Sequence, residues 1–418
     1  MANLSTHFVE QFSTNLRNIL KEHSPFQRTR VLDIYSVIDA INYQMQNKTY
    51  SQTLLYLLDK CKVKVTESAI IYRRNSLQID YFEKVYESLR IKYSYILDTV
   101  TTDTEYDLQM VDGSNVTLLP TFEKVGFSRI PNSKLSHGLI TGIYNQSRDI
   151  LSAFRFDKKY HEREQFMEAM KFVNLQSDKN VFVFDRGYWK REIAHYLLEN
   201  GHDFVFRMNK INNKLISLKT GETNDFIGSF EIGSGKDVQS IKVRYLHYKH
   251  DKYDYYIATS LFDVSIEEIK EIYTKRWTIE VVYKLLKGVC DLGIMKHKNE
   301  LFYAQNIHMF RITYLIQTIF TLALNYEYDV DKHQKKNYKL TMEAFNDYIF
   351  SKLVHKTPGY TNDVVNMIIV TMTHYVTAKP NRSFTRRALT MCKKWYLLSK
   401  IKVANEKQIK KRTASTTM

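Results

Sequence analysis

The chain has 418 residues, of which 25% are charged and 44% are hydrophobic. Only 13 are glycine and 5 are proline, while 30 are tyrosine and 23 are phenylalanine, a composition that excludes a fibrous or a disordered protein. Basic residues outnumber acidic ones by 16, which favours a nucleic acid partner, with a membrane surface second. The excess is uneven, because residues 1–350 carry about +4 and residues 351–418 about +12. Function in the first 350 residues must therefore be sought in particular sites.

Sequence features that report on cell location favour the cytoplasm. The three cysteines (Cys61, Cys290 and Cys392) form no CxxC pair, which predicts a reducing compartment and offers no zinc site. The N-terminus lacks the apolar core of a signal peptide. The longest apolar run, residues 309–326, contains Arg311 and Gln317, so we expect a buried core helix and no membrane segment.

Residues 1–96 are predicted to form a helical N-terminal domain. Apolar residues recur at helical spacing over 31–45, 51–60, 66–75 and 81–93, and Thr66 is a predicted N-cap. The helix pair within 51–75 could be a helix-turn-helix that presents Arg73 and Arg74 to DNA. The alternative is that these helices only build a bundle.

Residues 97–330 are predicted to form an α/β domain. Its expected strands lie within 107–119, 137–145, 150–157 and 179–189, and its expected helices within 161–175 and 191–201; acidic residues at the start of 161–175 suit the helix dipole. Residues 203–260 are strand-rich, and one long helix is expected from about 265 to 290. Residues 331–418 are predicted to be helical, with a basic tail that could contact phosphates.

Three acidic residues stand out by their context. Asp112 lies on a predicted strand before Gly-Ser, and Asp185 ends a buried apolar strand before Arg-Gly-Tyr, which is a costly place for a charge without a partner. Glu280 lies in the middle of the predicted long helix. Each has a structural alternative: a turn residue, a strand end or a surface ion pair.

Four residues of the predicted long helix share one of its faces. Projected at 100° per residue, Tyr273, Arg276, Glu280 and Lys287 fall within about 60° of one another. Two strand aspartates and this glutamate would give an all-oxygen site, which suits Mg²⁺ or Mn²⁺. Two such ions can activate water and stabilise the leaving oxygen in phosphodiester displacement.

These motifs carry a family resemblance. VDGS around Asp112, FDRGYW around Asp185 and the Tyr-x2-Arg-x3-Glu-x6-Lys spacing at 273–287 resemble DDE transposases of the insertion-sequence-four family. The resemblance covers about residues 100–320. It implies an α/β, ribonuclease H-like catalytic fold with a β-rich insertion between the second Asp and the Glu, where residues 203–260 stand.

The resemblance also implies roles for individual residues. Asp112, Asp185 and Glu280 correspond to the catalytic, metal-binding triad, with two Mg²⁺ or Mn²⁺ ions. Tyr273, Arg276 and Lys287 correspond to residues that hold phosphates of the transposon end. Arg186 and Tyr188, which stand in the FDRGYW motif, are further candidate DNA contacts. Trp189 and Trp277 are candidates for stacking on a flipped base, although a core role is equally compatible with the sequence.

The predicted function is cut-and-paste transposition of an insertion sequence. Its partners would be double-stranded DNA, both terminal inverted repeats and target, and by family analogy a second copy of the chain in the synaptic complex. The location would be the cytoplasm, on the nucleoid of a prokaryotic host. Two alternatives stay open: a catalytically silent or domesticated DNA-binding protein, and a ribonuclease H-like nuclease without strand transfer.

Overall fold

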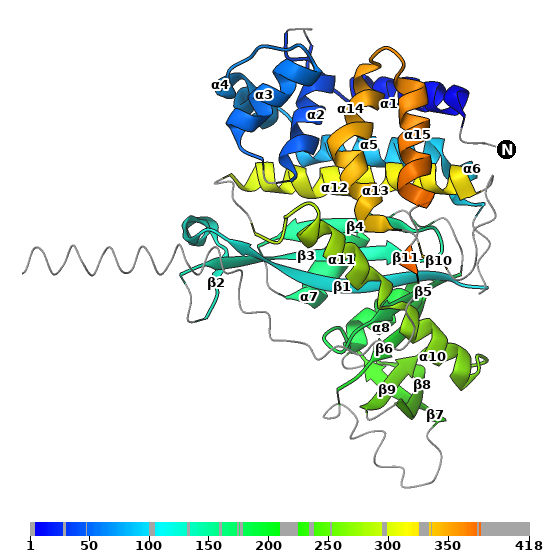
Figure 1. Cartoon of the computed structure of the whole chain (residues 1–418). Helices are drawn as coiled ribbons and strands as arrows, with labels where there is room; N and C mark the ends of the chain where they lie inside the picture. The colour runs from blue at the N-terminus through cyan, green and yellow to red at the C-terminus, as the bar shows by residue number, and fades with distance from the viewer. Residues whose placement is uncertain are drawn as a thin grey trace, which may run out of the picture. The chain divides into compact units, whose positions relative to one another are not determined.

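The computed structural model describes most of the chain between residues 5 and 377 (Figure 1). The described ranges are 5–27, 31–46, 48–99, 105–131, 134–158, 161–173, 175, 179–209, 225–233, 238–250, 253–294, 299–325, 334–335, 337–373 and 376–377. The predicted basic tail and residues 214–219 of the strand-rich segment lie outside them. Contacts group residues 1–332 and 336–376 into one unit, which is described below together with one small separate sheet.

A nine-stranded mixed sheet forms the centre of the unit. Its order is β2-β3-β1-β5-β6-β9-β8-β7, and β4 also pairs with β3. The strands are β1 (Asp107–Leu118), β2 (Ser128–Arg129), β3 (Ser136–Asn145), β4 (Ile150–Asp157), β5 (Asn180–Phe184), β6 (Asp203–Arg207), β7 (Asp225–Ile232), β8 (Gln239–His250) and β9 (Tyr253–Thr259). The pairs β1–β5 and β5–β6 are parallel, and the other pairs are antiparallel. A short 3₁₀ helix, η1 (Pro120–Val125), links β1 to β2.

Helices cover both faces of this sheet, because its central strands are apolar on both sides. One face packs on α10 (Ile266–Lys275), α11 (Thr278–Gly288) and α12 (Glu300–Asn325), and contributes Leu108, Met110, Val181 and Val183 to the larger core. The other face packs on α7 (Glu162–Met170) and α8 (Arg191–Glu199) in a second, phenylalanine-rich core. Alternate residues along each strand thus belong to different cores.

The N-terminal helices are α1 (Thr6–Glu22), α2 (Ile34–Gln44), α3 (Tyr50–Lys60), α4 (Glu67–Asn75), α5 (Ile79–Lys92) and α6 (Ser94–Leu97). Hydroxyl and carboxylate caps begin four of them: Ser5, Asp33, Thr49 and Thr66 each accept a backbone N–H of the first turn. The predicted helices over 31–45, 51–60, 66–75 and 81–93 and the predicted Thr66 cap are confirmed.

The N-terminal and C-terminal helices form one layer over the sheet (Figure 1). The C-terminal elements are α13 (Tyr338–Ala344), a π-helical turn η3 (Phe345–Ile349), α14 (Phe350–His355) and α15 (Tyr360–Thr373). Ser13 of α1 donates to the Leu353 carbonyl at 2.6 Å, and Asn42 of α2 donates to the Asn346 carbonyl at 3.1 Å. A separate two-stranded sheet pairs β10 (Gln334–Lys335) with β11 (Val376–Thr377).

Helix α12 is the apolar segment expected to be a core helix. Among the described residues it is the one helix long and apolar enough to cross a membrane, and 94% of its most apolar window is buried inside the protein. Arg311, within it, is buried and forms an ion pair with Glu83 and donates to the Leu151 and Ser152 carbonyls. These contacts agree with the predicted core helix.

Candidate active site

Asp112 and Asp185 lie at neighbouring positions on two adjacent parallel strands. Val111 of β1 is in register with Phe184 of β5. Asp112 and Asp185 are the residues that directly follow this pair on the two strands. Strand alternation sets Asp112 on the face of Met110 and points both carboxylates toward α10 and α11. The sheet therefore brings together two acidic groups that are 73 residues apart in the sequence.

Helices α10 and α11 bring a phenol, a guanidinium and a third carboxylate to this pair. The Tyr273 hydroxyl donates to Asp185 Oδ1 at 3.3 Å. Arg276 Nη2 donates to Glu280 Oε1 at 3.0 Å, and its Nη1 lies 3.7 Å from Asp112 Oδ2. Arg276, itself buried, thus links the carboxylates of Asp112 and Glu280.

The predicted single helix over 265–290 is wrong, because the helix breaks beside the site. Helix α10 ends at Lys275 and α11 begins at Thr278. Between them the backbone tightens: the Arg276 and Trp277 amides bond to carbonyls three residues back. The Thr278 hydroxyl donates to the Lys275 carbonyl at 2.7 Å and so competes with the regular helical hydrogen bond. Glu280 consequently lies in the first turn of α11.

Burial sets the electrostatics of the site. It raises the pKa of Asp112 to about 7; Arg276 and the Gly113 amide act against this, and Asp185 and Glu280 add to it. The Gly113 N–H donates to Asp112 Oδ1 at 2.9 Å. Burial alone would lower the pKa of Arg276, but nearby Tyr273, Asp185 and Asp112 raise it overall. The site therefore holds more acidic groups than its one buried guanidinium neutralises, and it favours an added cation.

Two further residues of α11 anchor this helix to β1. The Tyr283 hydroxyl donates to the Asp112 carbonyl at 2.7 Å, and Lys287 Nζ donates to the Asn115 carbonyl at 2.7 Å. Burial lowers the pKa of Lys287. The Lys287 side chain therefore contacts β1 three residues beyond Asp112.

Glu162, the first residue of α7, is a fourth acidic group that the sequence analysis attributed to the helix dipole. A Cβ on Gly113 would lie 3.1 Å from Glu162 Oε1, and one on Gly187 would lie 2.7 Å from Glu162 Oε2. Burial first, and then Asp185, raise the pKa of Glu162. The available signal was the pair of glycines, Gly113 directly after one aspartate and Gly187 two residues after the other.

The structure separates the remaining candidates near FDRGYW into core and surface residues. Tyr188 is buried against Phe166 and Phe184, and Trp189 packs edge-on against Phe206. The buried Tyr188 hydroxyl has no hydrogen-bond partner among the described atoms. Arg186 is exposed.

Trp277 stands at the break between α10 and α11 and is 46% exposed. Arg276 and Lys284 each lie 6.0 Å from its ring centroid. Of the two tryptophans considered for base stacking, Trp277 is thus the one with an accessible ring.

Arg73 and Arg74 of α4 lie apart from this site. Arg74 is fully buried, and its guanidinium donates to Gln44, Gln305 and Asn306 and to the Phe302 carbonyl. The expected DNA contact of Arg74 is therefore corrected: its donors are used inside the protein. Arg73 is half-buried and stacks on Phe26, with 4.2 Å to the ring centroid.

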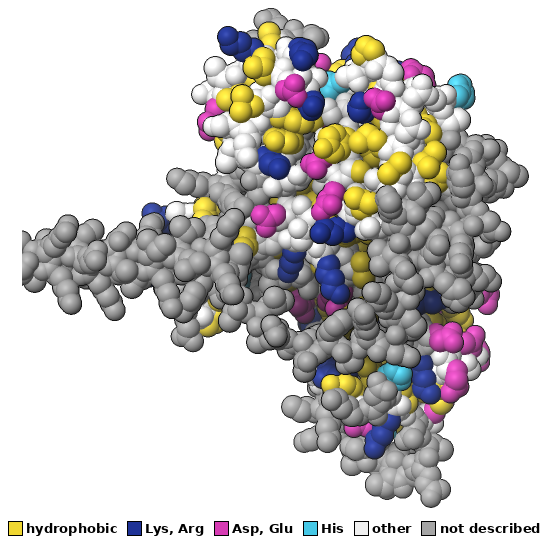
Figure 2. All heavy atoms as spheres, viewed as in Figure 1, with side chains coloured by type: hydrophobic (Ala, Val, Ile, Leu, Met, Phe, Trp, Pro, Cys, Tyr) yellow, Lys and Arg dark blue, Asp and Glu magenta, His cyan; other side chains and the backbone are white. Residues whose placement is uncertain are grey.

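The visible surface carries both signs of charge. Figure 2 shows Lys and Arg side chains intermixed with Asp and Glu over the described part of this face, and hydrophobic side chains over the upper helical layer. This agrees with the near-neutral charge counted for residues 1–350.

Residues 103–316, half of the chain, match the family model described as the transposase DDE domain. The chain belongs to the DDE transposase family. The predicted resemblance to DDE transposases is thereby confirmed, and the matched residues contain Asp112, Asp185 and Glu280.

Two curated relatives of this DDE family member are insertion-sequence proteins. The chain is 34% identical over 147 residues to the protein assigned as transposase of element IS4SA in Synechocystis sp., an alignment that covers 33% of this chain and 40% of the relative. It is 26% identical over 188 residues to the protein assigned as transposase of element IS5377 in Geobacillus stearothermophilus, covering 42% and 47%. The chain thus matches less than half the length of either relative.

Among solved structures, the chain is similar to a piggyBac transposase in a synaptic complex with hairpin DNA. The TM-score is 0.45 at 11% sequence identity, and the alignment covers 92% of this chain and 87% of that one.

Proposed function

We propose that the chain is a DNA transposase that excises an insertion sequence and joins it to target DNA. The observation that carries this proposal is the meeting of Asp112, Asp185 and Glu280 around one buried guanidinium, inside the segment that matches the DDE domain. Each of these carboxylates comes from a different element, so no local structural need accounts for their convergence.

The sheet supports a ribonuclease H-like catalytic fold. Strands β4, β3 and β1 are antiparallel neighbours, and β5 and β6 follow parallel to β1, which is the strand order of that fold. We propose residues 97–330 as the catalytic domain. Strand β6 continues the parallel part of the sheet beside β5, so the β-rich insertion would consist chiefly of the antiparallel strands β7–β9.

The donor set fits a divalent cation. Asp112, Asp185 and Glu280 offer only carboxylate oxygens, which hard ions such as Mg²⁺ or Mn²⁺ prefer, and the buried Tyr188 hydroxyl nearby lacks a partner among the described atoms. When bound there, such ions supply water activation and stabilisation of the leaving oxygen. Without them, the single positive charge of Arg276 is shared between Asp112 and Glu280.

The residues of the chain have distinct proposed roles in this reaction. Tyr273 orients Asp185 through its hydrogen bond. Tyr283 fixes the backbone of β1 at Asp112. Arg276 would exchange a carboxylate for a DNA phosphate, since both bind the guanidinium fork in the same way.

Further proposed DNA contacts are Lys287, Arg186, Trp277 and the basic tail, which lies outside the described residues. Electrostatic contacts of the tail with phosphates would weaken as salt rises. A dimer that pairs two transposon ends is part of the same proposal, as is action on DNA in the cytoplasm of a prokaryotic host.

The test is a cleavage assay on a supercoiled plasmid that carries the element's own ends, taken from the DNA that flanks the gene. With Mg²⁺, the unaltered chain should nick and release the element. Asp112→Ala, Asp185→Ala and Glu280→Ala should each abolish cleavage while binding the ends as before. Glu267→Ala, which removes an exposed carboxylate of α10 with no contact to the triad, is the matched control. Retained cleavage by the triple variant would refute the proposal.

The same assay separates the alternatives. A silent DNA-binding derivative would bind the ends without Mg²⁺-dependent nicking. A nuclease would cleave but would not join pre-cut ends with free 3′-hydroxyls to a target plasmid. Joined products from such ends would favour the transposase.

A further inference from the structure

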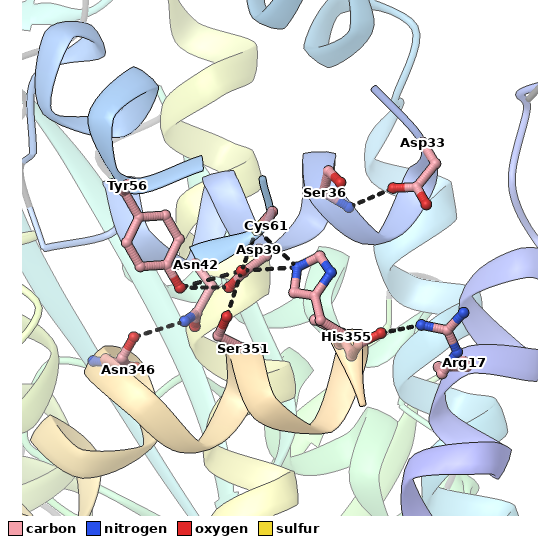
Figure 3. A network of polar contacts seen from close by, with 11 residues as sticks. Arg17, Asp33, Ser36, Asp39, Asn42, Tyr56, Cys61, Asn346, Ser351 and His355 are labelled. Carbon is pink, nitrogen blue, oxygen red and sulfur yellow. Dashed lines mark hydrogen bonds and ion pairs between the residues drawn. The ribbon is translucent and has the colours of Figure 1, made fainter. Parts of the chain in front are cut away.

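Three chemically different side chains converge where α2, α3 and α14 meet (Figure 3). Asp39 of α2 is completely buried, Cys61 directly follows α3, and His355 ends α14. Asp39 Oδ2 lies 3.0 Å from His355 Nε2 and 3.6 Å from Cys61 Sγ, and the latter two atoms are 3.2 Å apart. Among the described residues, this is the group of possible metal ligands whose ligand atoms all lie within 4.8 Å of one another.

Hydrogen bonds alone cannot account for all three close contacts among Asp39, Cys61 and His355. The imidazole Nε2 and the thiol carry at most one hydrogen each, so at most two of the three contacts can be hydrogen bonds. Asp39 Oδ2 also accepts from the Ser351 hydroxyl at 2.9 Å and the Tyr56 hydroxyl at 3.1 Å. Because Tyr56 lies equally 3.1 Å from Asp39 Oδ1, the competing donors at Oδ2 are Ser351, His355 and Cys61, three for an oxygen that has about two lone pairs.

A metal ion bound by all three atoms, just outside their plane, removes this conflict. Thiolate, neutral imidazole and carboxylate would each direct a lone pair at the ion. Tetrahedral zinc binds sulfur at about 2.3 Å and nitrogen or oxygen at about 2.0–2.2 Å, which places ligand atoms roughly 3.3–3.6 Å apart. The observed separations of 3.0, 3.2 and 3.6 Å differ from these by only a few tenths of an ångström.

We propose that Asp39, Cys61 and His355 bind one structural Zn²⁺ ion. The mixed sulfur, nitrogen and oxygen donor set selects zinc over magnesium. Ser351 and Tyr56 hold the carboxylate of Asp39 in place, as the partners of metal ligands commonly do. The fourth ligand would be a water molecule.

The ion would fasten helices from opposite ends of the chain. Ligands on α2 and α3 come from the first 61 residues, whereas His355 lies almost 300 residues later. The cysteine spacing gives no sign of this site, since only one of its ligands is a cysteine and the three are brought together by the fold. The site shares no residue with the acidic triad, and its proposal stands independently of transposition.

The first test measures metal content of the full-length chain. After removal of metal with a chelator and dialysis against Zn²⁺, we expect about one zinc per chain by mass spectrometry of the metal. Zn²⁺ should also raise the thermal midpoint of the unaltered chain. Absence of both effects would overturn the proposal and leave a purely hydrogen-bonded network.

The second test replaces zinc with Co²⁺, whose charge-transfer absorption reports a bound thiolate. The band should appear in the unaltered chain and vanish in Cys61→Ser and His355→Gln. Cys290→Ser and Cys392→Ser are the matched controls and should keep it. A band that survives in Cys61→Ser would refute the site, and binding at the acidic triad would give no thiolate band.

Ser351→Ala is a milder variant that separates loss of zinc binding from failure to fold. It keeps all three ligands and removes only the hydroxyl that orients Asp39, so it should weaken zinc binding roughly 10–100-fold. Unchanged zinc affinity in this variant, together with no loss in His355→Gln, would contradict the proposal. DNA cleavage is not the readout, so failure here would leave the proposed transposase function untouched.

Discussion

Replacing Asp112 by asparagine should stabilise the protein at alkaline pH while abolishing catalysis. Burial raises the pKa of Asp112 from 3.8 to about 7, and its side chain is only 20% exposed. Between about pH 4 and pH 7 the unfolded chain has lost this proton while the folded chain keeps it, so stability falls as pH rises. At about 1.4 kcal/mol per pKa unit, the cost reaches at most about 4 kcal/mol above pH 7. Asparagine cannot ionise, so the Asp112→Asn variant does not lose this stability as the pH rises.

Urea denaturation at several pH values between 4 and 9, followed by tryptophan fluorescence in chelated buffer, measures this difference. The gain of Asp112→Asn over the unaltered chain should be near zero at pH 4 and largest at pH 8. Asp80→Asn, which removes an exposed carboxylate paired with Lys84, should show little change at either pH. A gain that is absent at pH 8, or equal at pH 4 and pH 8, would refute the reasoning. Added Mg²⁺ should stabilise the unaltered chain at pH 8 but not Asp112→Asn.

Three other substitutions probe separate features. Tyr283→Phe removes the hydrogen bond to the Asp112 carbonyl and should lower the free energy of unfolding by about 1 kcal/mol in urea titrations; an unchanged midpoint would contradict the anchoring role. Arg74→Ala leaves several buried acceptors unpaired and should cost more than about 2 kcal/mol, with end binding intact in the gel-shift assay wherever the variant is folded. Trp277→Ala removes an exposed ring and should slow element release with the thermal midpoint unchanged, whereas a large drop in that midpoint would assign the ring to the core.

Much of the architecture was predictable because local patterns decide it. Helical periodicity and caps such as Thr66 located the helices within residues 31–93, and the apolar strand before Asp185 placed that residue at a strand end. The mixed α/β character with a large sheet followed from the order of these elements. The family resemblance of three short motifs implied that Asp112, Asp185 and Glu280 act together, but the helix break that sets Glu280 in the first turn of α11 was not predicted.

The rest depends on contacts between distant segments. Nothing local distinguishes Glu162 from other acidic residues in a first helical turn until two glycines let it approach the site. Arg74 has the charge of a surface residue, and only the packing of α4 against α12 shows that it is buried. The break at Arg276 is accompanied by the hydrogen bond from the Thr278 hydroxyl to the Lys275 carbonyl, which a uniform projection of 100° per residue does not register.

The helical layer shared by the two ends of the chain has a consequence for folding during synthesis. Helix α1 is synthesised long before α14 and α15, yet it packs against both and bonds to Leu353, 340 residues later. At about 5–20 residues per second, the ribosome needs roughly 17–70 s to deliver that partner. During this time part of the apolar face formed by Phe8, Phe12 and Leu16 is not yet buried by the helices that cover it in the folded protein. Nascent chains are thus exposed to aggregation and to chaperones, and loss of the last hundred residues would leave the first helix without α14 and α15, although α2 and α5 would remain.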